Sequence, residues 1–257
     1  MPSSPLRLVV AGAGPAYSDR PGSLGSAYVV VAPGGASVVL DLGQGTFPNL
    51  FRAVRPESVE AILISHLHPD HFVDLVPLRH YLRFELGGHA EVRVAAPAEL
   101  AARLDALSGE ADFADAALAI EPLATGAVSV GGGLAVEATR VAHRGEAYAF
   151  RVSRQSGGPG LVYSGDCGRA SDLEPLVRPG DTLLTEVSFG TGPAPVPDMH
   201  LDAVAVAGLA ARTGAGRVLL THLQMGYDRG ATMAAVRSGF AGPVGLVDPG
   251  DSFDIVG

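Results

Sequence analysis

The chain has 257 residues, of which 47% are hydrophobic and 18% are charged, and its formal net charge is −9. A chain of this length can bury a large core, and we expect a single domain over residues 1–257. The acidic balance argues against binding to long nucleic acid, because such binding depends on the neutralisation of phosphates by basic residues.

The cysteine content and the hydropathy pattern bear on location. The single cysteine excludes an internal disulfide, which is typical of proteins of a reducing compartment. No run of about 18 apolar residues is present, so we expect no transmembrane helix. The first ten residues lack a basic segment followed by a long apolar region, which argues against a signal peptide. We therefore expect a cytoplasmic protein that does not contact a membrane.

Short apolar runs typical of strands alternate with segments of helical periodicity along the chain. In the first half, we expect strands at residues 37–42, 61–64 and 92–96, and helices at 70–86, disturbed at Pro77, and at 98–107. Residues 127–164 are rich in strand signals, with a Gly-rich loop at 156–160. The remainder predicts a helix at 200–212, a strand at 217–221, a helix at 231–238 and short strands at 244–247 and 253–256.

Three histidines and one aspartate are packed into six residues, from His66 to His71. His66 and His68 are two residues apart, so in an extended segment their side chains point to the same side and can bind one metal ion. Asp70 and His71 follow where the chain turns into the expected helix, and they can reach a second ion. Imidazole and carboxylate are ligands that zinc, manganese and iron prefer. The spacing therefore predicts a metal site at the carboxyl end of a strand.

Residues of the same types follow three further expected strands. They are His143, after residues 134–142, Asp166, after residues 160–165, and His222, after residues 217–221. A single isolated histidine is more often a core residue held by hydrogen bonds. Repetition of a strand followed by a metal-ligating residue favours one shared metal site.

Several segments resemble motifs of the metallo-β-lactamase superfamily of hydrolases, and specifically its ribonuclease Z and cyclic-nucleotide phosphodiesterase branch. They are the Gly-rich opening at 11–14 with Arg20 and Ser26, the D-L-G-Q-G-T turn at 41–46, the S-G-D segment at 164–166, the glutamate segment at 186–189 with His200 downstream, and the T-H-L segment at 221–223. The resemblance covers essentially the whole chain. It implies an α/β fold in which two sheets with helices outside form a four-layer αβ/βα sandwich.

The resemblance also implies a dinuclear site for two divalent metal ions. The expected metal is zinc, with manganese or iron as alternatives that the ligand types leave open. The first metal would be held by His66, His68 and His143, the second by Asp70, His71 and His222, and Asp166 would bridge them. Asp41 is expected to accept hydrogen bonds from ligand histidines without binding metal itself.

The expected reaction follows from the charge of such a centre. A hydroxide bridging the two metals would attack phosphorus, and the metals would neutralise the developing negative charge. His200 is the expected proton donor to the leaving group, with Glu186 orienting it, and both join Asp70 in the expected catalytic set. A purely structural role for His200, at the start of the helix 201–212, is the alternative.

The spacing of the motifs bears on the substrate. Ribonuclease Z proteins carry a long arm for transfer RNA, in many members between the residues that match His143 and Asp166. These two residues are 23 positions apart here, which leaves no room for the arm. Pro69 also stands where ribonuclease Z commonly has glycine. We therefore expect a phosphodiesterase for a small anionic phosphodiester such as a cyclic nucleotide.

Other activities on the same fold remain as alternatives. They are a ribonuclease Z-like RNA 3′-processing nuclease, a lactone or thioester hydrolase that uses the same dimetal site, and a non-catalytic binding module with a degenerate site. Tyr227 and Arg229 could contact the phosphate or base, or belong to a solvated loop. Members of the family often form dimers, so a homodimer stays an open alternative without an interface signature in this sequence.

Overall fold

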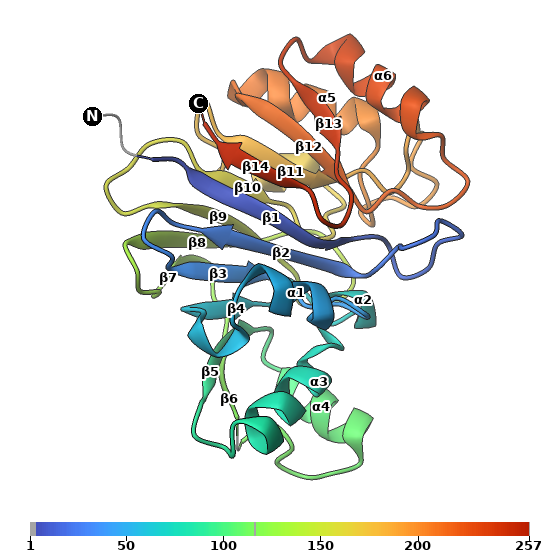
Figure 1. Ribbon diagram of the computed structural model, residues 1–257. Coiled ribbons are helices and arrows are strands. Elements are labelled where there is room, and N and C mark those ends of the chain that lie inside the picture. The colour runs from blue at the N-terminus through green and yellow to red at the C-terminus, as the bar shows by residue number, and fades with distance from the viewer. Residues whose placement is uncertain (1–3, 116, 257) are drawn as a thin grey trace.

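The computed structural model describes residues 4–115 and 117–256, which form two mixed seven-stranded sheets (Figure 1). The first sheet has the order β14 (Ser252–Ile255), β1 (Leu6–Ala13), β2 (Ser26–Val31), β3 (Ser37–Leu40), β4 (Ala61–Leu63), β5 (Val92–Ala96) and β6 (Leu118–Pro122). The second has the order β13 (Val244–Leu246), β12 (Arg217–Thr221), β11 (Thr182–Glu186), β10 (Leu161–Tyr163), β9 (Tyr148–Arg154), β8 (Leu134–Arg140) and β7 (Gly126–Val128).

Each sheet combines antiparallel strands with a run of parallel strands. The parallel runs are β3–β4–β5–β6 in the first sheet and β10–β11–β12–β13 in the second. Parallel strands have their carboxyl ends at the same edge of a sheet, where α/β folds place their ligands. The segments after β4, β10 and β12 carry most of the residues that the sequence assigns to the metal site.

The helices lie outside the sheets. They are α1 (Phe47–Ala53), α2 (Pro69–Phe72), α3 (Leu75–His80), α4 (Leu100–Ser108), α5 (Ala203–Thr213) and α6 (Arg229–Gly239), with 3-10 turns at Pro56–Ser58 and Ala170–Leu173 and a π-helical segment at Tyr81–Glu85. Figure 1 shows α5 and α6 grouped at one end of the molecule, α3 and α4 at the other, and α1 and α2 between them.

Three clusters of buried hydrophobic residues fill the spaces between the layers. One lies between the sheets and includes Leu8, Tyr28 and Phe150. The other two lie between each sheet and its helices, for example around Leu220 beneath α5 and around Ile62 beneath α1 to α4. The arrangement is two sheets face to face with helices outside, which confirms the predicted α/β sandwich. Among the helices of the described residues, none combines the length and the apolar character that a membrane span requires.

The predicted elements are present, but two of the predicted helices differ in extent, and β1, β2, α1, β6 and β11 were not predicted from the sequence. The helix predicted over 70–86 is divided into α2, α3 and the π-helical segment, and the interruption lies at residues 73–74 rather than at Pro77. Pro77 falls in the first turn of α3, where backbone N–H groups have no intrahelical acceptor, so the helix tolerates it. The helix predicted from residue 200 begins at Ala203, because the Asp202 carboxylate caps it by accepting the Ala205 N–H at 2.9 Å.

Candidate metal centre

The residues that the sequence assigns to the first metal lie together at the strand ends. The Nδ1 atom of His68 lies 3.0 Å from Nε2 of His66 and 3.2 Å from Nε2 of His143. The Oδ2 atom of Asp166 lies 3.6 Å from the former Nε2 and 3.8 Å from the latter. Ligand atoms about 2.0–2.1 Å from a tetrahedral zinc ion are separated by about 3.3 Å. These four donors therefore have the spacing of a zinc site.

The residues assigned to the second metal form an adjacent group. The Nε2 atoms of His71 and His222 lie 3.4 Å apart, and Asp70 Oδ2 lies 3.5 Å and 3.2 Å from them, respectively. The other carboxylate oxygen of Asp166, Oδ1, lies 3.4 Å from both nitrogens. This group has the same spacing as the first, and Asp166 faces both groups with one oxygen each.

The electrostatics of the centre indicate missing positive charge. The buried Oδ1 atom of Asp166 has no hydrogen-bond partner among the described residues, which is costly for a buried carboxylate. Burial raises the pKa of Asp166, but the charges of His222 and His71 outweigh this effect and keep the pKa well below its usual range. Burial opposes protonation of His71, yet the charges of Asp166 and two other carboxylates raise its pKa. Divalent cations would supply the charge that these carboxylates lack.

The protonation state of His66 also fits metal binding. Burial, together with the neighbouring charge of His71, lowers the pKa of His66 well below its usual value. The ring is therefore neutral, and a metal binds the neutral form of histidine.

Asp41 orients the ligands from the end of β3. Its carboxylate accepts hydrogen bonds from the Ser65 N–H at 2.6 Å, from the Ser65 hydroxyl at 2.7 Å and from the Tyr163 hydroxyl at 2.6 Å. His71 Nδ1 donates to the same carboxylate at 2.7 Å. Because this bond holds a proton on Nδ1, the Nε2 atom, which faces the other donors, is the one left to bind a metal ion. This contact is the one predicted for Asp41.

Glycine at position 43 allows the turn after β3 to approach the histidine motif. A Cβ atom at this position would lie 1.8 Å from the carbonyl oxygen of Asp70. The Leu42 N–H donates to the His71 carbonyl at 2.7 Å, and the Asp74 N–H donates to the Leu42 carbonyl at 3.0 Å. The turn and the motif are thus fixed to one another through their backbones.

A second carboxylate, Glu186 at the end of β11, orients residues on the other sheet. Its Oε1 lies 2.9 Å from Nδ1 of His200, and its Oε2 accepts from the Ser188 hydroxyl at 2.6 Å. The Ser188 oxygen lies 2.9 Å from Nδ1 of His222 and can accept its proton. Burial lowers the pKa of His200, but Glu186 and the charge of Asp166 outweigh it and raise this pKa to about 9.

Two of the predicted contact residues, Arg229 and Tyr227, contact other residues of the chain. Arg229 makes a bidentate ion pair with Asp248, at 2.7 and 2.6 Å. Tyr227 packs against Gly190, where a Cβ atom would lie 2.5 Å from its ring. Arg20, in the Gly-rich opening, donates to the carbonyl oxygens of residues 223, 224 and 227, so it fixes the loop after His222.

Sequence analysis did not identify the hydroxyls that support the ligands, those of Ser65, Tyr163 and Ser188. Ser65 precedes the histidine motif directly, and this adjacency was the available signal. The other two reach the site only through the pairing of strands.

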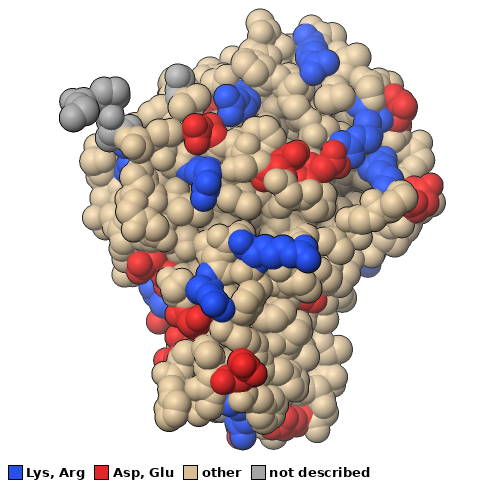
Figure 2. Space-filling model, viewed as in Figure 1, with Lys and Arg blue, Asp and Glu red and all other residues tan. Residues whose placement is uncertain are grey.

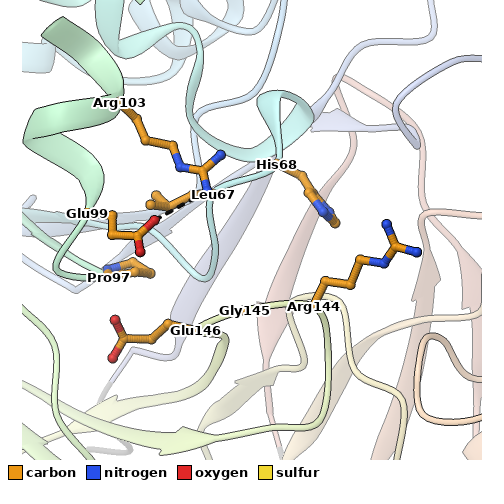
Figure 3. A pocket seen from close by; sticks show the side chains of 8 residues that line it. All are labelled: Leu67, His68, Pro97, Glu99, Arg103, Arg144, Gly145 and Glu146. Atoms are coloured by element: carbon orange, nitrogen blue, oxygen red, sulfur yellow. Dashed lines mark hydrogen bonds and ion pairs between the residues drawn. The ribbon is translucent and has the colours of Figure 1, made fainter. Parts of the chain in front are cut away.

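A pocket of about 280 Å³ opens beside the first group of donors (Figure 3). It is lined by Leu67, His68, Pro97, Glu99, Arg103, Arg144, Gly145 and Glu146. His68 is thus shared between the pocket and the donor group, so a molecule in the pocket lies next to the centre.

Comparison with known proteins agrees with this geometry. The model of the β-lactamase superfamily domain matches residues 38–223. An uncharacterized protein of Mycobacterium leprae is 33% identical over 240 residues, which cover 91% of this chain and 84% of the relative. The probable metallo-hydrolase YhfI of Bacillus subtilis is 23% identical over 202 residues, which cover 74% of this chain and 76% of YhfI.

Solved structures show the same fold. The crystal structure of Bacillus subtilis YhfI has a TM-score of 0.84 at 21% identity and covers 97% of this chain and 99% of its own. The short form of human tRNase Z and a diphosphatase from the PhnP family each have a TM-score of 0.73, at 20% and 19% identity. They cover 97% and 98% of this chain, respectively, and 99% of their own chains. The family match, the fold and the convergent donors together establish that the chain belongs to the metallo-β-lactamase superfamily of hydrolases.

Proposed function

We propose that the protein is a dinuclear metal-dependent phosphodiesterase that hydrolyses a small phosphodiester such as a cyclic nucleotide. The observation that carries this proposal is the position of Asp166, whose two carboxylate oxygens each face a separate set of imidazole and carboxylate donors at 3.4–3.8 Å. In this proposal His66, His68 and His143 hold one metal, Asp70, His71 and His222 hold the other, and Asp166 bridges them. Zinc is the proposed metal, because the donor types and their separations suit it.

Two divalent cations at these positions would activate water and neutralise charge on the phosphoryl oxygens. Two ionised carboxylates, those of Asp70 and Asp166, leave a net charge of about +2 on such a centre, which attracts an anionic substrate. His200 is the proposed proton donor to the leaving oxygen. Its side chain is 12% exposed, and its Nδ1 is held by Glu186, so the opposite ring nitrogen is left for the substrate.

The dimensions of the site favour a small substrate. The pocket beside His68 has a volume of about 280 Å³, near the lower limit of about 300–1,000 Å³ for small-molecule sites. The segment between His143 and Asp166 consists of β9, β10 and their connecting turns, so no arm for RNA projects there. On the face drawn in Figure 2, arginines are interspersed with acidic side chains. These features favour a single nucleotide unit over a polynucleotide.

The relatives favour phosphorus as the reacting centre. Two proteins of similar fold, a human tRNase Z and a diphosphatase of the PhnP family, carry names that denote hydrolysis at phosphorus. The tRNase Z likeness also supports the second candidate function, an RNA 3′-processing nuclease. A lactone or thioester hydrolase would need no anionic subsite, and the excess positive charge of the loaded centre favours phosphate over these neutral substrates.

The proposal is tested by assaying zinc-reconstituted protein with bis(p-nitrophenyl) phosphate and 3′,5′-cyclic AMP. We expect turnover of both substrates by the wild type and none by His68→Ala. His80→Ala is the matched control, because His80 is exposed on α3 and its one hydrogen bond among the described residues is to the Val76 carbonyl of its own helix. Cleavage of precursor transfer RNA, but not of cyclic AMP, would favour the nuclease. Hydrolysis of lactones or thioesters alone would refute the proposed phosphodiesterase.

A further inference from the structure

The charged residues of the pocket beside His68 are paired, with one exception. Glu99 and Arg103 form an ion pair at 3.3 Å. The carboxylate of Glu146 is occupied on both oxygens, because Oε1 accepts from Arg140 at 2.7 Å and from the Tyr148 hydroxyl at 2.8 Å, and Oε2 accepts from the backbone N–H of residue 98 at 3.2 Å. These pairs leave little net charge on that wall of the pocket.

The exception is Arg144. Its side chain is exposed, and it has no hydrogen bond or ion pair to any residue of the described ranges. It follows His143 directly, so the two Cα atoms are about 3.8 Å apart. His143 is in turn held by the bond of its Nδ1 to the Met199 carbonyl at 2.8 Å. The backbone therefore fixes the base of the Arg144 side chain at the edge of the metal centre.

The orientation of Arg144 places its charge at the metal side of the pocket. Figure 3 shows Arg144 and His68 on one side of the pocket, and Glu146, Pro97 and Glu99 on the other. The pocket thus combines one uncompensated cation beside the centre with a partly apolar opposite wall that includes Leu67 and Pro97. A molecule with a phosphate at one end and a less polar body would match both features.

We infer that Arg144 is a specificity-determining residue that binds the phosphate of a nucleotide whose nucleoside part occupies the pocket. This inference rests on the proposed function and names the substrate class of the same site. The planar guanidinium can donate two parallel hydrogen bonds to phosphate oxygens. Because Arg144 carries no other partner among the described residues, no existing ion pair has to be broken when the phosphate binds. The residue thereby favours an anionic phosphodiester over a neutral ester of similar shape.

The test is calorimetric binding of 5′-AMP and of adenosine, its neutral counterpart, to zinc-loaded protein. We expect Arg144→Gln to weaken binding of 5′-AMP about tenfold or more, the loss typical of a charge-assisted hydrogen bond, and to leave the affinity for adenosine unchanged. Arg144→Lys should restore only part of the loss, because an ammonium keeps the charge without the bidentate geometry. With 3′,5′-cyclic AMP as substrate, the defect should appear mainly in KM.

Arg7→Gln is the matched control. Arg7 is exposed on β1, six residues from Ala13, whose carbonyl accepts the His222 N–H. It therefore lies about 20 Å along the strand from the centre. Its removal changes the net charge equally and should leave 5′-AMP binding unchanged.

Four results would overturn the inference. They are absence of 5′-AMP binding to the wild type, unchanged binding in Arg144→Gln, an equal loss in Arg7→Gln, and an equal loss of adenosine binding. Failure of the proposed function is recognised separately, since wild-type protein would then bind two zinc ions without hydrolysing phosphodiesters. If the wild type hydrolyses phosphodiesters but Arg144→Gln binds 5′-AMP as tightly as the wild type, the role of Arg144 is rejected and the proposed function stands.

Discussion

Glu186 Oε1 and His200 Nδ1 lie 2.9 Å apart, so a buried carboxylate fixes one nitrogen of an imidazole beside Asp166. A carboxylate in this position orients the ring and stabilises its protonated form. The contact is the one that the sequence predicted between these two residues. The contact is consistent with the proposed role of His200 as proton donor to the leaving oxygen.

The role of His200 predicts a dependence on the leaving group. His200→Ala should lower kcat for 3′,5′-cyclic AMP about 100-fold or more, because a ribose alkoxide needs a proton to leave. Hydrolysis of bis(p-nitrophenyl) phosphate should fall much less, since nitrophenolate leaves without one. Parallel assays of both substrates at equal zinc content check this prediction. An equal loss for the two substrates would instead indicate a structural role.

The hydroxyl of Ser188 connects Glu186 to His222, with distances of 2.6 and 2.9 Å. Ser188→Ala removes the acceptor that holds the His222 ring, and residues of this kind typically contribute 10- to 100-fold to metal affinity. We expect one of the two sites in Ser188→Ala to bind zinc about 10-fold or more weakly than in the wild type, as measured by competition with a chelating dye. Ser238→Ala, at an exposed position of α6, is the control. An unchanged zinc affinity in Ser188→Ala would show that the hydrogen bond from His222 to Ser188 does not support metal binding.

Removal of metal should destabilise the fold. The donors come together only in the folded protein, and a ligand that binds the folded state alone at a hundredfold excess over its Kd adds about 2.7 kcal/mol to the free energy of unfolding. For a chain of this size that corresponds to a loss of roughly 5–10 °C in Tm on chelation. Differential scanning calorimetry with and without chelator measures the shift. The shift should largely disappear in Asp166→Ala, and an unchanged wild-type Tm would show that the donors hold no cation.

The close approach of Gly43 to the Asp70 carbonyl oxygen predicts a strong effect of a single methyl group. In Gly43→Ala the new Cβ would lie 1.8 Å from backbone that cannot move independently. We expect a loss of about 1–3 kcal/mol in the free energy of unfolding, measured by urea denaturation. Gly208→Ala in α5 is the control, because its Cβ would meet only the flexible end of Arg212. If Gly43→Ala left the free energy of unfolding unchanged, the turn after β3 and the histidine motif would not be rigidly joined.

The sequence predicted those parts of the fold and site in which local pattern and chemistry coincide. Strands β5 and β12 have the predicted bounds, because each is a short apolar run next to turn residues. The donors lie together because all of them are on the segments that follow β4, β8, β10 and β12, and parallel strands end at a common edge of a sheet. Strand β1 was not predicted, although its alternation of Leu6, Leu8 and Val10 with more exposed residues is the signal of a strand.

The supporting hydroxyls of Tyr163 and Ser188 could not be predicted, because their roles arise from strand pairing. The register of β11 with β12 places Glu186 opposite Thr221, and this pairing brings Ser188 beside His222, 34 positions away. Tyr163 reaches Asp41 from the opposite sheet. Local periodicity in the sequence does not predict such contacts, since they depend on which strands pair and on how the two sheets stack.

The most direct test of the proposed dinuclear phosphodiesterase is a zinc titration of metal-free protein, with the rate of 3′,5′-cyclic AMP hydrolysis measured at each step. The rate should rise and level off at two equivalents of bound zinc, and Asp166→Ala should remain inactive throughout. Wild-type protein that binds two equivalents and leaves cyclic AMP and other phosphodiesters intact would contradict the proposed function.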